Sequence, residues 1–294
     1  MRAALVTELG RPPEAGEAPE PAGETLEVLA APLNPLDRAV AAGTFYGGHP
    51  PLPFVSGCEC VGREAGGRIV WTFGGGLGLT RDGAMAERAV PGAFVVEVPD
   101  GAEPAMAAAL GIAGLAGWLP VAWRAPVRED DRVLVLGATG AVGQVAVQAA
   151  KLLGAAHIVA AGRDAKGLER ALELGADEAV PVDGDFGEPT YVFDPLCAEP
   201  LERAVAAAAP GARIVQLGQS AGPGATLSSA AIRGKQLEVF GFSDFAVPPE
   251  VLVEHYGRLV RHAVAGEIRL DVDEIGLADV AESWTRRGKI VVRP

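Results

Sequence analysis

Cysteine is scarce in this sequence. The 294 residues include only three cysteines, Cys58, Cys60 and Cys197, and no two of them form a Cys-x-x-Cys pair. An odd, small number of cysteines argues against a disulfide framework and suits a reducing compartment. The apolar run near the start, residues 3–6, is too short for a signal peptide. We therefore expect a cytoplasmic protein.

Basic residues are few relative to acidic ones. The formal net charge is -13, from 25 Lys and Arg against 38 Asp and Glu. Such a surface repels phosphate backbones and anionic membranes, so we expect neither nucleic acid nor a membrane as a partner. The uncharged stretch 104–123 is long enough to cross a bilayer, but it is mostly Ala and Gly and contains Pro104 and Pro120. We interpret it as a buried helix and turn between two domains.

The chain changes its pattern about halfway. Up to about residue 117, short apolar segments broken by Gly and Pro predict β-strands, with a loop over 32–53. From about Arg132, strands alternate with helices, which is typical of a parallel, doubly wound sheet. The tail contains two predicted helices, 250–265 and 277–286, and a final strand, 289–292.

The most informative motif follows the first strand of the second half. It places a triplet of glycines, Gly137, Gly140 and Gly143, between an apolar strand and a helix. The first glycine allows a tight turn, the second lets the backbone approach a pyrophosphate, and the third allows the helix to pack closely on the strand. The helix N-terminus supplies neutral N–H donors for the phosphates, which offsets the acidic surface. The residues expected to bind a dinucleotide here are Gly137, Ala138, Thr139, Gly140, Ala141, Val142 and Gly143.

The second strand of this half favours a phosphorylated cofactor. NAD-binding sheets usually end this strand in Asp or Glu, but here it ends in Gly162 and Arg163, with Lys166 shortly after. A guanidinium at this place can bind a 2′-phosphate and stack on adenine. We therefore predict NADPH, with Gly162, Arg163 and Lys166 at its adenosine end. Asp164 keeps NAD open, because its carboxylate could reach the ribose.

Several segments together resemble the medium-chain dehydrogenase/reductase superfamily, and the zinc-free quinone oxidoreductases within it. They are Asn34-Pro-Leu-Asp37, Leu52-Pro-Phe-Val-Ser-Gly-Cys-Glu-Cys-Val-Gly62, Gly83-Ala-Met-Ala-Glu87, Val98-Pro-Asp-Gly101, Val215-Gln-Leu-Gly218 and Gly288-Lys-Ile-Val-Val292. The resemblance implies a Rossmann dinucleotide-binding domain over 118–245 and a mainly β, GroES-like catalytic domain formed by 1–117 and 246–294. It also places Leu217 and Gly218 beside the cofactor.

The same resemblance implies a site without zinc. Zinc members of the family have a Cys in the first loop and a Gly-His-Glu segment. Here the first-loop position falls near Leu36, and the second segment reads Gly57-Cys58-Glu59. Cys58 alone could bind a metal, but no partner ligand is evident, so we predict no metal site. Tyr46 resembles the loop tyrosine that approaches the substrate in zinc-free reductases, and Asn34 resembles the family's Asn near the nicotinamide.

The combined prediction is a reductase that uses NADPH to transfer hydride to a quinone or an α,β-unsaturated carbonyl. Tyr46 would donate a hydrogen bond or a proton, and Asn34 would orient the substrate oxygen. A short-chain reductase is disfavoured, because the sequence has no Tyr-x-x-x-Lys motif. A non-catalytic NADPH-binding sensor or structural protein stays open, as does a zinc-type alcohol dehydrogenase. The family also leads us to expect a homodimer formed by the strand near 237–240.

Overall fold

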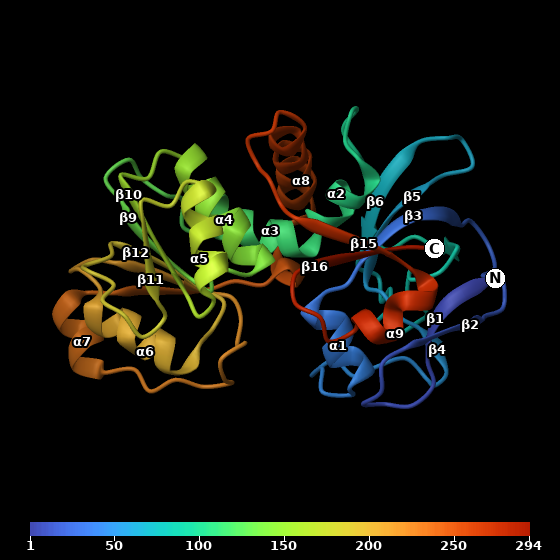
Figure 1. Ribbon diagram of the computed structural model, residues 1–294, viewed down its shortest axis with the longest axis horizontal. Helices are drawn as coiled ribbons and strands as arrows, with labels where there is room; N and C mark the ends of the chain where they lie inside the picture. The colour runs from blue at the N-terminus through green and yellow to red at the C-terminus, as the bar shows by residue number, and fades with distance from the viewer. The chain divides into compact units, whose positions relative to one another are not determined.

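The computed structural model describes residues 1–294 and divides into two compact units (Figure 1). Unit 1 comprises Met1–Ala113, Pro248–Ala265 and Leu270–Pro294, and unit 2 comprises Gly114–Val247 and Gly266–Arg269. The chain thus returns to unit 1 after completing most of unit 2. The domain limits given above, 117/118 and 245/246, remain a prediction about the functional domains.

Unit 2 is built on a six-stranded sheet whose strand order is β11-β10-β9-β12-β13-β14. All its neighbouring strands are parallel. The strands are β9 (Arg132–Leu136), β10 (His157–Gly162), β11 (Glu178–Pro181), β12 (Tyr191–Asp194), β13 (Arg213–Gln216) and β14 (Glu238–Gly241). The order reverses between β9 and β12, and such a switch point is where doubly wound sheets bind ligands at the carboxyl ends of their strands. The predicted doubly wound parallel sheet is confirmed.

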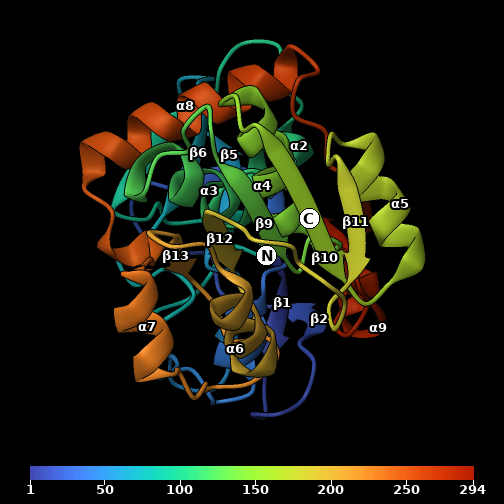
Figure 2. The same ribbon diagram turned by 90° about the vertical axis from the view of Figure 1, so that its left-hand side faces the viewer.

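Helices cover both faces of this sheet (Figures 1 and 2). They are α4 (Ala141–Leu152), α5 (Ala165–Glu173), α6 (Ala198–Ala207) and α7 (Ser229–Lys235). Leu134 and Leu136 of β9 pack in one apolar cluster with residues of α6 and α7, whereas α4 and α5 lie against β9, β10 and β11 from the other face. Alternate side chains of β9 are therefore buried on opposite faces, as expected for a strand in the middle of a parallel sheet.

Unit 1 is mainly β. Its larger sheet has the order β15-β16-β3-β5-β6-β8, with β7 also paired to β3, and its smaller sheet has the order β2-β1-β4. The strands are β1 (Arg2–Val6), β2 (Glu14–Glu17), β3 (Leu26–Pro32), β4 (Phe54–Val55), β5 (Glu59–Arg63), β6 (Ile69–Phe73), β7 (Arg88–Ala89), β8 (Phe94–Glu97), β15 (Val272–Gly276) and β16 (Lys289–Arg293). The C-terminal strand β16 pairs antiparallel with β3, so the last strand of the chain completes a sheet that begins near residue 26 (Figure 1).

Two local predictions for unit 1 were wrong. The expected loop 32–53 contains helix α1 (Pro35–Ala41), which begins directly after Asn34. Proline is well suited to the first helical position, because the N–H that it lacks has no partner there. The expected helix 277–286 is a 3-10 turn, Leu277–Asp279, followed by the short α9 (Val280–Ser283). The chain must turn at Gly288, which has φ +100°, to start β16.

The uncharged stretch 104–123 is divided into short helical segments. They are α2 (Pro104–Ala109), α3 (Ile112–Leu119) and a π-helical turn, Pro120–Arg124. A longer helix, α8 (Pro249–Val264), follows the return of the chain to unit 1. Within residues 1–294, no helix combines the length and apolar character needed to cross a bilayer.

Candidate active site

The glycine loop of unit 2 has the geometry that its sequence requires. Gly137 follows β9 with φ +64°, a conformation that other residues rarely adopt. A Cβ on Gly143 would lie 2.3 Å from the carbonyl oxygen of Gly137, so helix α4 packs directly on the turn. A Cβ on Gly140, by contrast, would meet only that carbonyl oxygen, at 3.5 Å. The backbone conformation explains the glycine at 137, and the close packing of α4 explains the glycine at 143. Neither reason applies to Gly140.

Thr139 joins this loop to the next β–α turn. A Cβ on Gly162, at the end of β10, would lie 2.5 Å from Thr139 Cγ2, and one on Gly167 would lie 2.7 Å from Thr139 Cβ. The amide of Ala138 also donates to the carbonyl of Ala161 at 3.0 Å. The two turns are therefore held against each other. The sequence does not single out Gly167, because a glycine within a helical pattern gives no distinctive signal.

The turn after β10 presents two exposed basic side chains, Arg163 and Lys166. Between them, Asp164 is the N-cap of α5, and its Oδ2 accepts the N–H of Gly167 at 2.7 Å. An N-cap carboxylate satisfies an otherwise unpartnered helix donor and interacts favourably with the helix dipole. The carboxylate of Asp164 therefore points toward α5 and stabilises the start of that helix.

The ends of β12 and β13 meet beside the glycine loop. A Cβ on Gly137 would lie 3.1 Å from Leu196, and one on Gly218 would lie 2.6 Å from the carbonyl oxygen of Pro195. Leu217, partly buried, donates its N–H to the carbonyl of Asp194 at 2.9 Å. Leu217 and Gly218 therefore lie at the same edge of the sheet as the glycine loop, on the far side of the switch point.

Asp194 is a buried acid that the sequence did not reveal. Its Oδ1 accepts the N–H groups of Leu196 and Cys197, both at 2.9 Å, and its Oδ2 is buried without a hydrogen-bond partner. Burial raises the pKa of this carboxyl, and the two backbone N–H groups lower it in part. Only the folded chain shows this environment, because an Asp before Pro in the sequence reads as an ordinary turn.

The two predicted catalytic residues lie in unit 1 in very different surroundings. Tyr46, in the loop after α1, is 89% exposed, and its ring packs at a tilt on Phe45 with the centroids 4.5 Å apart. Asn34 is 2% exposed and precedes α1. Its Oδ1 accepts from Lys289 Nζ at 2.7 Å, and its Nδ2 donates to Glu59 Oε1 at 2.8 Å. The Tyr46 hydroxyl is open to solvent, whereas the Asn34 amide is part of a buried network.

The acids around Asn34 are already bound to protein groups. Asp37 accepts the N–H of Asn34 at 2.7 Å and that of Cys58 at 2.8 Å. Glu59 accepts from Asn34, from Trp71 Nε1 at 2.7 Å and from the N–H of Ile112 at 2.8 Å. Burial raises the pKa of Asp37 and of Glu59, and the ammonium of Lys289 acts in the opposite direction.

These surroundings do not fit a zinc ion at Cys58. A zinc site needs at least three protein ligands. The thiol of Cys58 is buried, and burial and the neighbouring charge of Asp37 raise its pKa well above the usual range. The positive charge near Asp37 and Glu59 is supplied by Lys289. Nowhere in residues 1–294 do three or more His, Cys, Asp or Glu side chains form a group that could hold a metal.

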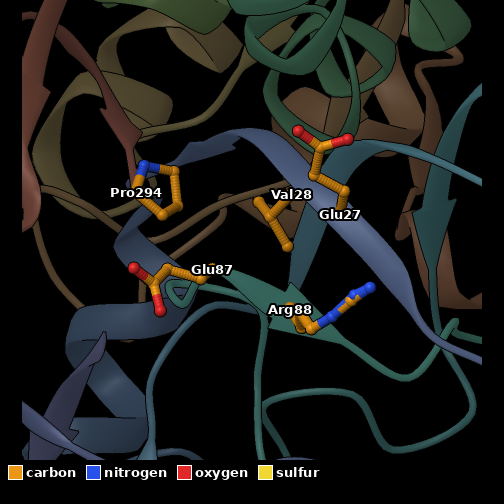
Figure 3. Close-up of a pocket in the computed structure, with 5 residues that line it drawn as sticks. All are labelled: Glu27, Val28, Glu87, Arg88 and Pro294. Carbon is orange, nitrogen blue, oxygen red and sulfur yellow. The ribbon is translucent and has the colours of Figure 1, made fainter. Parts of the chain in front are cut away.

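A surface hollow in unit 1 lies apart from all of these residues. It measures about 400 Å³ and is lined by Glu27, Val28, Glu87, Arg88 and Pro294 (Figure 3). Glu27 pairs with Arg63 at 2.8 Å, and Glu87 accepts the N–H of Arg2 at 2.8 Å. Since its two acids are already paired and no predicted site residue lines it, we do not assign this hollow to the site.

Comparisons with known proteins agree with this architecture. Residues 141–250 match the family described as "Zinc-binding dehydrogenase". The chain is 29% identical over 311 residues to a phenolphthiocerol/phthiocerol polyketide synthase of Mycobacterium tuberculosis, covering 92% of the chain but 14% of that protein. It is 30% identical over 191 residues to quinone oxidoreductase of Homo sapiens, covering 60% of the chain and 57% of that protein. It therefore spans only part of each relative.

Among solved structures, quinone oxidoreductase from Thermus thermophilus, determined alone and with NADPH, superimposes with a TM-score of 0.83 at 28% identity and covers 100% of both chains. With the fold and the glycine loop described above, these findings show that the chain is similar in fold and sequence to oxidoreductases of the medium-chain dehydrogenase/reductase superfamily. Within that superfamily, the similarity extends to quinone oxidoreductases.

Proposed function

We propose that the protein is a zinc-independent reductase that uses NADPH to transfer hydride to a quinone or an α,β-unsaturated carbonyl. The observation that carries this proposal is the glycine loop at the switch point of unit 2. Its first and third glycines are required by the fold, and its second leaves open space at the N-terminus of α4. A phosphate group would explain that space, because the amides there point away from the helix.

The residues present fit NADPH. The N–H groups at 141–143 would bind the pyrophosphate, and Arg163 and Lys166 would bind the 2′-phosphate. Asp164 favours this choice over NAD, because its carboxylate is used as the cap of α5. Leu217 and Gly218 would border the cofactor at the ends of the strands. NADPH, when bound, supplies the hydride.

The residues of unit 1 support a substrate that needs little activation. In a quinone or an enone, the charge that follows hydride addition spreads onto oxygen, and hydrogen-bond donors stabilise it there. Tyr46 is the proposed donor, because its hydroxyl is exposed and its ring is supported by Phe45. Asn34 is the proposed orienting residue, through the N–H of its amide that Glu59 does not use.

A second substrate class has a specific observation in its favour. The relative that matches over 92% of the chain is a polyketide synthase. Polyketide chains are carried as thioesters, and an enoyl thioester accepts hydride at its β-carbon in the same way as an enone. We therefore keep an α,β-unsaturated thioester as the alternative substrate.

The deciding experiment measures NADPH oxidation with 1,4-benzoquinone, a simple enone and a crotonyl thioester, each with and without a chelator. We expect turnover that survives chelation and prefers NADPH to NADH. Substitution of Tyr46 by Phe should lower kcat about a hundredfold, the lower end of what a positioned proton donor contributes. Loss of turnover on chelation would support a zinc-type enzyme instead. Tight NADPH binding without turnover of any of the three would support a sensor or structural protein.

We further propose that the protein acts in the cytoplasm as a homodimer. All three cysteines are free and buried, as suits a reducing compartment. Strand β14 is the edge of the unit 2 sheet, and its Val239 is 47% exposed. An unpaired edge strand is available to pair with the same strand of a second copy.

A further inference from the structure

A chain of three polar side chains crosses the interior of unit 1. Lys289 Nζ donates to Asn34 Oδ1 at 2.7 Å, and Asn34 Nδ2 donates to Glu59 Oε1 at 2.8 Å. Lys289 is 4% exposed, Asn34 is 2% exposed, and Glu59 is fully buried. Lys289 and Asn34 are separated by 255 positions in the sequence. Buried polar groups are costly unless they are paired, and here each member of the chain is paired.

The partners fix which way the Asn34 amide points. An ammonium can only donate hydrogen bonds, and a carboxylate can only accept them. The amide oxygen must therefore face Lys289, and the amide nitrogen must face Glu59. Rotation of the amide by half a turn would place donor against donor at Lys289 and acceptor against acceptor at Glu59. Glu59 uses only one of the two N–H groups of the Asn34 amide. Because Lys289 and Glu59 fix the plane of the amide, they also fix the direction in which the second N–H points.

Glu59 also holds the start of α3. Its Oε2 accepts the N–H of Ile112 at 2.8 Å and Trp71 Nε1 at 2.7 Å. A Cβ on Gly111 would lie 2.0 Å from this oxygen and 2.4 Å from Trp71 Nε1, so only glycine fits between them. Trp71 is fixed in turn, because its ring stacks on Tyr256 with centroids 4.4 Å apart.

Helix α3 has a particular place in the chain. It begins at Ile112 in unit 1, and from Gly114 onward its residues belong to unit 2. It is therefore the first covalent connection between the two units. One carboxylate thus contacts both Asn34, through Oε1, and the first residue of this connection, through Oε2.

We propose that Glu59 and Lys289 are positioning residues: together they lock the Asn34 amide as a hydrogen-bond donor for the substrate oxygen, and Glu59 fixes the first turn of α3. The role given to Asn34 rests on the proposed function, whereas the fixing of α3 does not. Neither Glu59 nor Lys289 touches the substrate. Both act through the groups that they hold.

The hydrogen-bond polarity of this network gives a sharp test. Glu59→Gln introduces an amide that must meet the three donors on Asn34, Trp71 and Ile112 with a single acceptor oxygen, so at least one contact becomes donor against donor. Asn34→Asp sets two carboxylates against each other. The double variant Asn34→Asp/Glu59→Gln matches every contact again: Asp accepts from Lys289 and from the new Gln, whose oxygen accepts from Trp71 and Ile112. It also keeps the net charge, and Asp remains a good N-cap for α1.

The first measurement is amide hydrogen exchange by mass spectrometry on peptides that cover 111–119, for the full chain. We expect each single variant to lose about tenfold or more of the protection there, because a buried polar group left without its hydrogen-bond partner destabilises the structure around it. The double variant should recover it. Glu254→Gln, an exposed change on α8, is the matched control and should leave protection unchanged.

The second measurement is turnover of whichever of 1,4-benzoquinone, the enone and the crotonyl thioester the wild-type protein reduces. We expect Asn34→Asp/Glu59→Gln to remain low in kcat with an unchanged KM for NADPH, because aspartate lacks the N–H that Asn34 offers. Unchanged exchange in Glu59→Gln would overturn the fixing of α3. If the double variant is no better protected than the single variants, Glu59 and Lys289 do not fix the orientation of the Asn34 amide. If the double variant keeps the kcat of the wild type, Asn34 does not donate to the substrate. If the wild-type protein reduces no substrate, the proposed function fails while the exchange results still decide the rest.

Discussion

At the scale of single residues, the proposed preference for NADPH rests on the turn after β10. Arg163 and Lys166 are exposed and have room to bind a phosphate, while Asp164 caps α5 through Gly167. An acid in this turn would repel a 2′-phosphate if it faced the cofactor, but a capping carboxylate is turned toward its helix. The expected preference for NADPH over NADH therefore depends on the Asp164 carboxylate capping α5 instead of facing the cofactor.

Arg163→Ala should raise the KM for NADPH about tenfold and leave that for NADH unchanged. A hydrogen bond to a charged group contributes about 1.5 to 3 kcal/mol, and only NADPH carries the 2′-phosphate. Steady-state kinetics with both cofactors measure the effect. Arg132→Ala, an exposed change at the opposite end of β9, is the control. Equal losses for both cofactors would show that Arg163 does not bind the 2′-phosphate.

Asp194 should make stability depend on pH. Burial raises the pKa of its carboxyl in the folded chain above the ordinary value of 3.8, so the folded state holds this proton more tightly than the unfolded state does. The free energy of unfolding should therefore fall as pH rises above 3.8 and through the folded pKa. Asp194→Asn keeps an acceptor for Leu196 and Cys197 and removes the ionisation, so its profile should be flatter.

Urea unfolding of both proteins between about pH 4 and pH 8 tests this. The stability advantage of Asp194→Asn should grow with pH. Asp130→Asn, at an exposed position, should follow the wild type. Parallel profiles for wild type and Asp194→Asn would mean that Asp194 ionises as readily in the folded chain as in the unfolded one.

At the scale of elements, the turn between β9 and α4 combines two demands. The sheet requires α4 to pack closely, which Gly143 permits, and the proposed cofactor requires open space at the helix N-terminus, which Gly140 leaves. The three glycines look equivalent in sequence, but in the structure each lies against different atoms. We therefore expect Gly143 to contribute mainly to the stability of the fold and Gly140 mainly to the binding of NADPH.

Gly140→Ala should leave the thermal midpoint nearly unchanged and weaken NADPH binding about tenfold or more. Its Cβ meets no protein atom closer than 3.5 Å, so only a bound phosphate would be displaced. Gly143→Ala should instead destabilise the fold by about 1 to 3 kcal/mol, because its Cβ lies 2.3 Å from the Gly137 oxygen. Thermal unfolding and fluorescence titration with NADPH measure the two effects. Undiminished affinity in Gly140→Ala would remove the pyrophosphate from this place.

At the scale of the whole molecule, the edge of the unit 2 sheet bears on the state of assembly. Strand β14 pairs only with β13, and its residues alternate little in burial, being exposed or partly exposed throughout. Val239 leaves an apolar side chain on this edge. Unprotected edges are usually blunted by charge or covered by another chain, which favours the second copy proposed above.

Val239→Lys should convert a dimer to a monomer, because a charge on an edge strand opposes pairing with a second edge. Size-exclusion chromatography with light scattering measures the mass. Val264→Lys, which changes a 47% exposed valine on α8, is the control and should leave the mass unchanged. A wild-type protein that is monomeric at all concentrations tested would overturn the proposed dimer.

The sequence by itself determined the doubly wound sheet and the glycine loop. Both are written in neighbouring residues: apolar strands of four to six residues, helices ended by glycine, and three glycines between Leu136 and Gln144. It missed α1, because the prolines around it dominate the local pattern, and it missed β15, whose Asp273 and Glu274 read as a polar loop. In the structure β15 is an edge strand whose acids pair with Arg286 and Arg293.

Only the tertiary structure decided what surrounds the site residues. Asn34, Glu59 and Lys289 were visible in motifs that resemble the family, but nothing in those motifs shows that they form one buried chain of hydrogen bonds. Hydrogen-bond partners 255 positions apart meet only when β16 has paired with β3. Local sequence fixes elements because their energetics are local, whereas the charge, polarity and accessibility of a site depend on which elements the folded chain brings together.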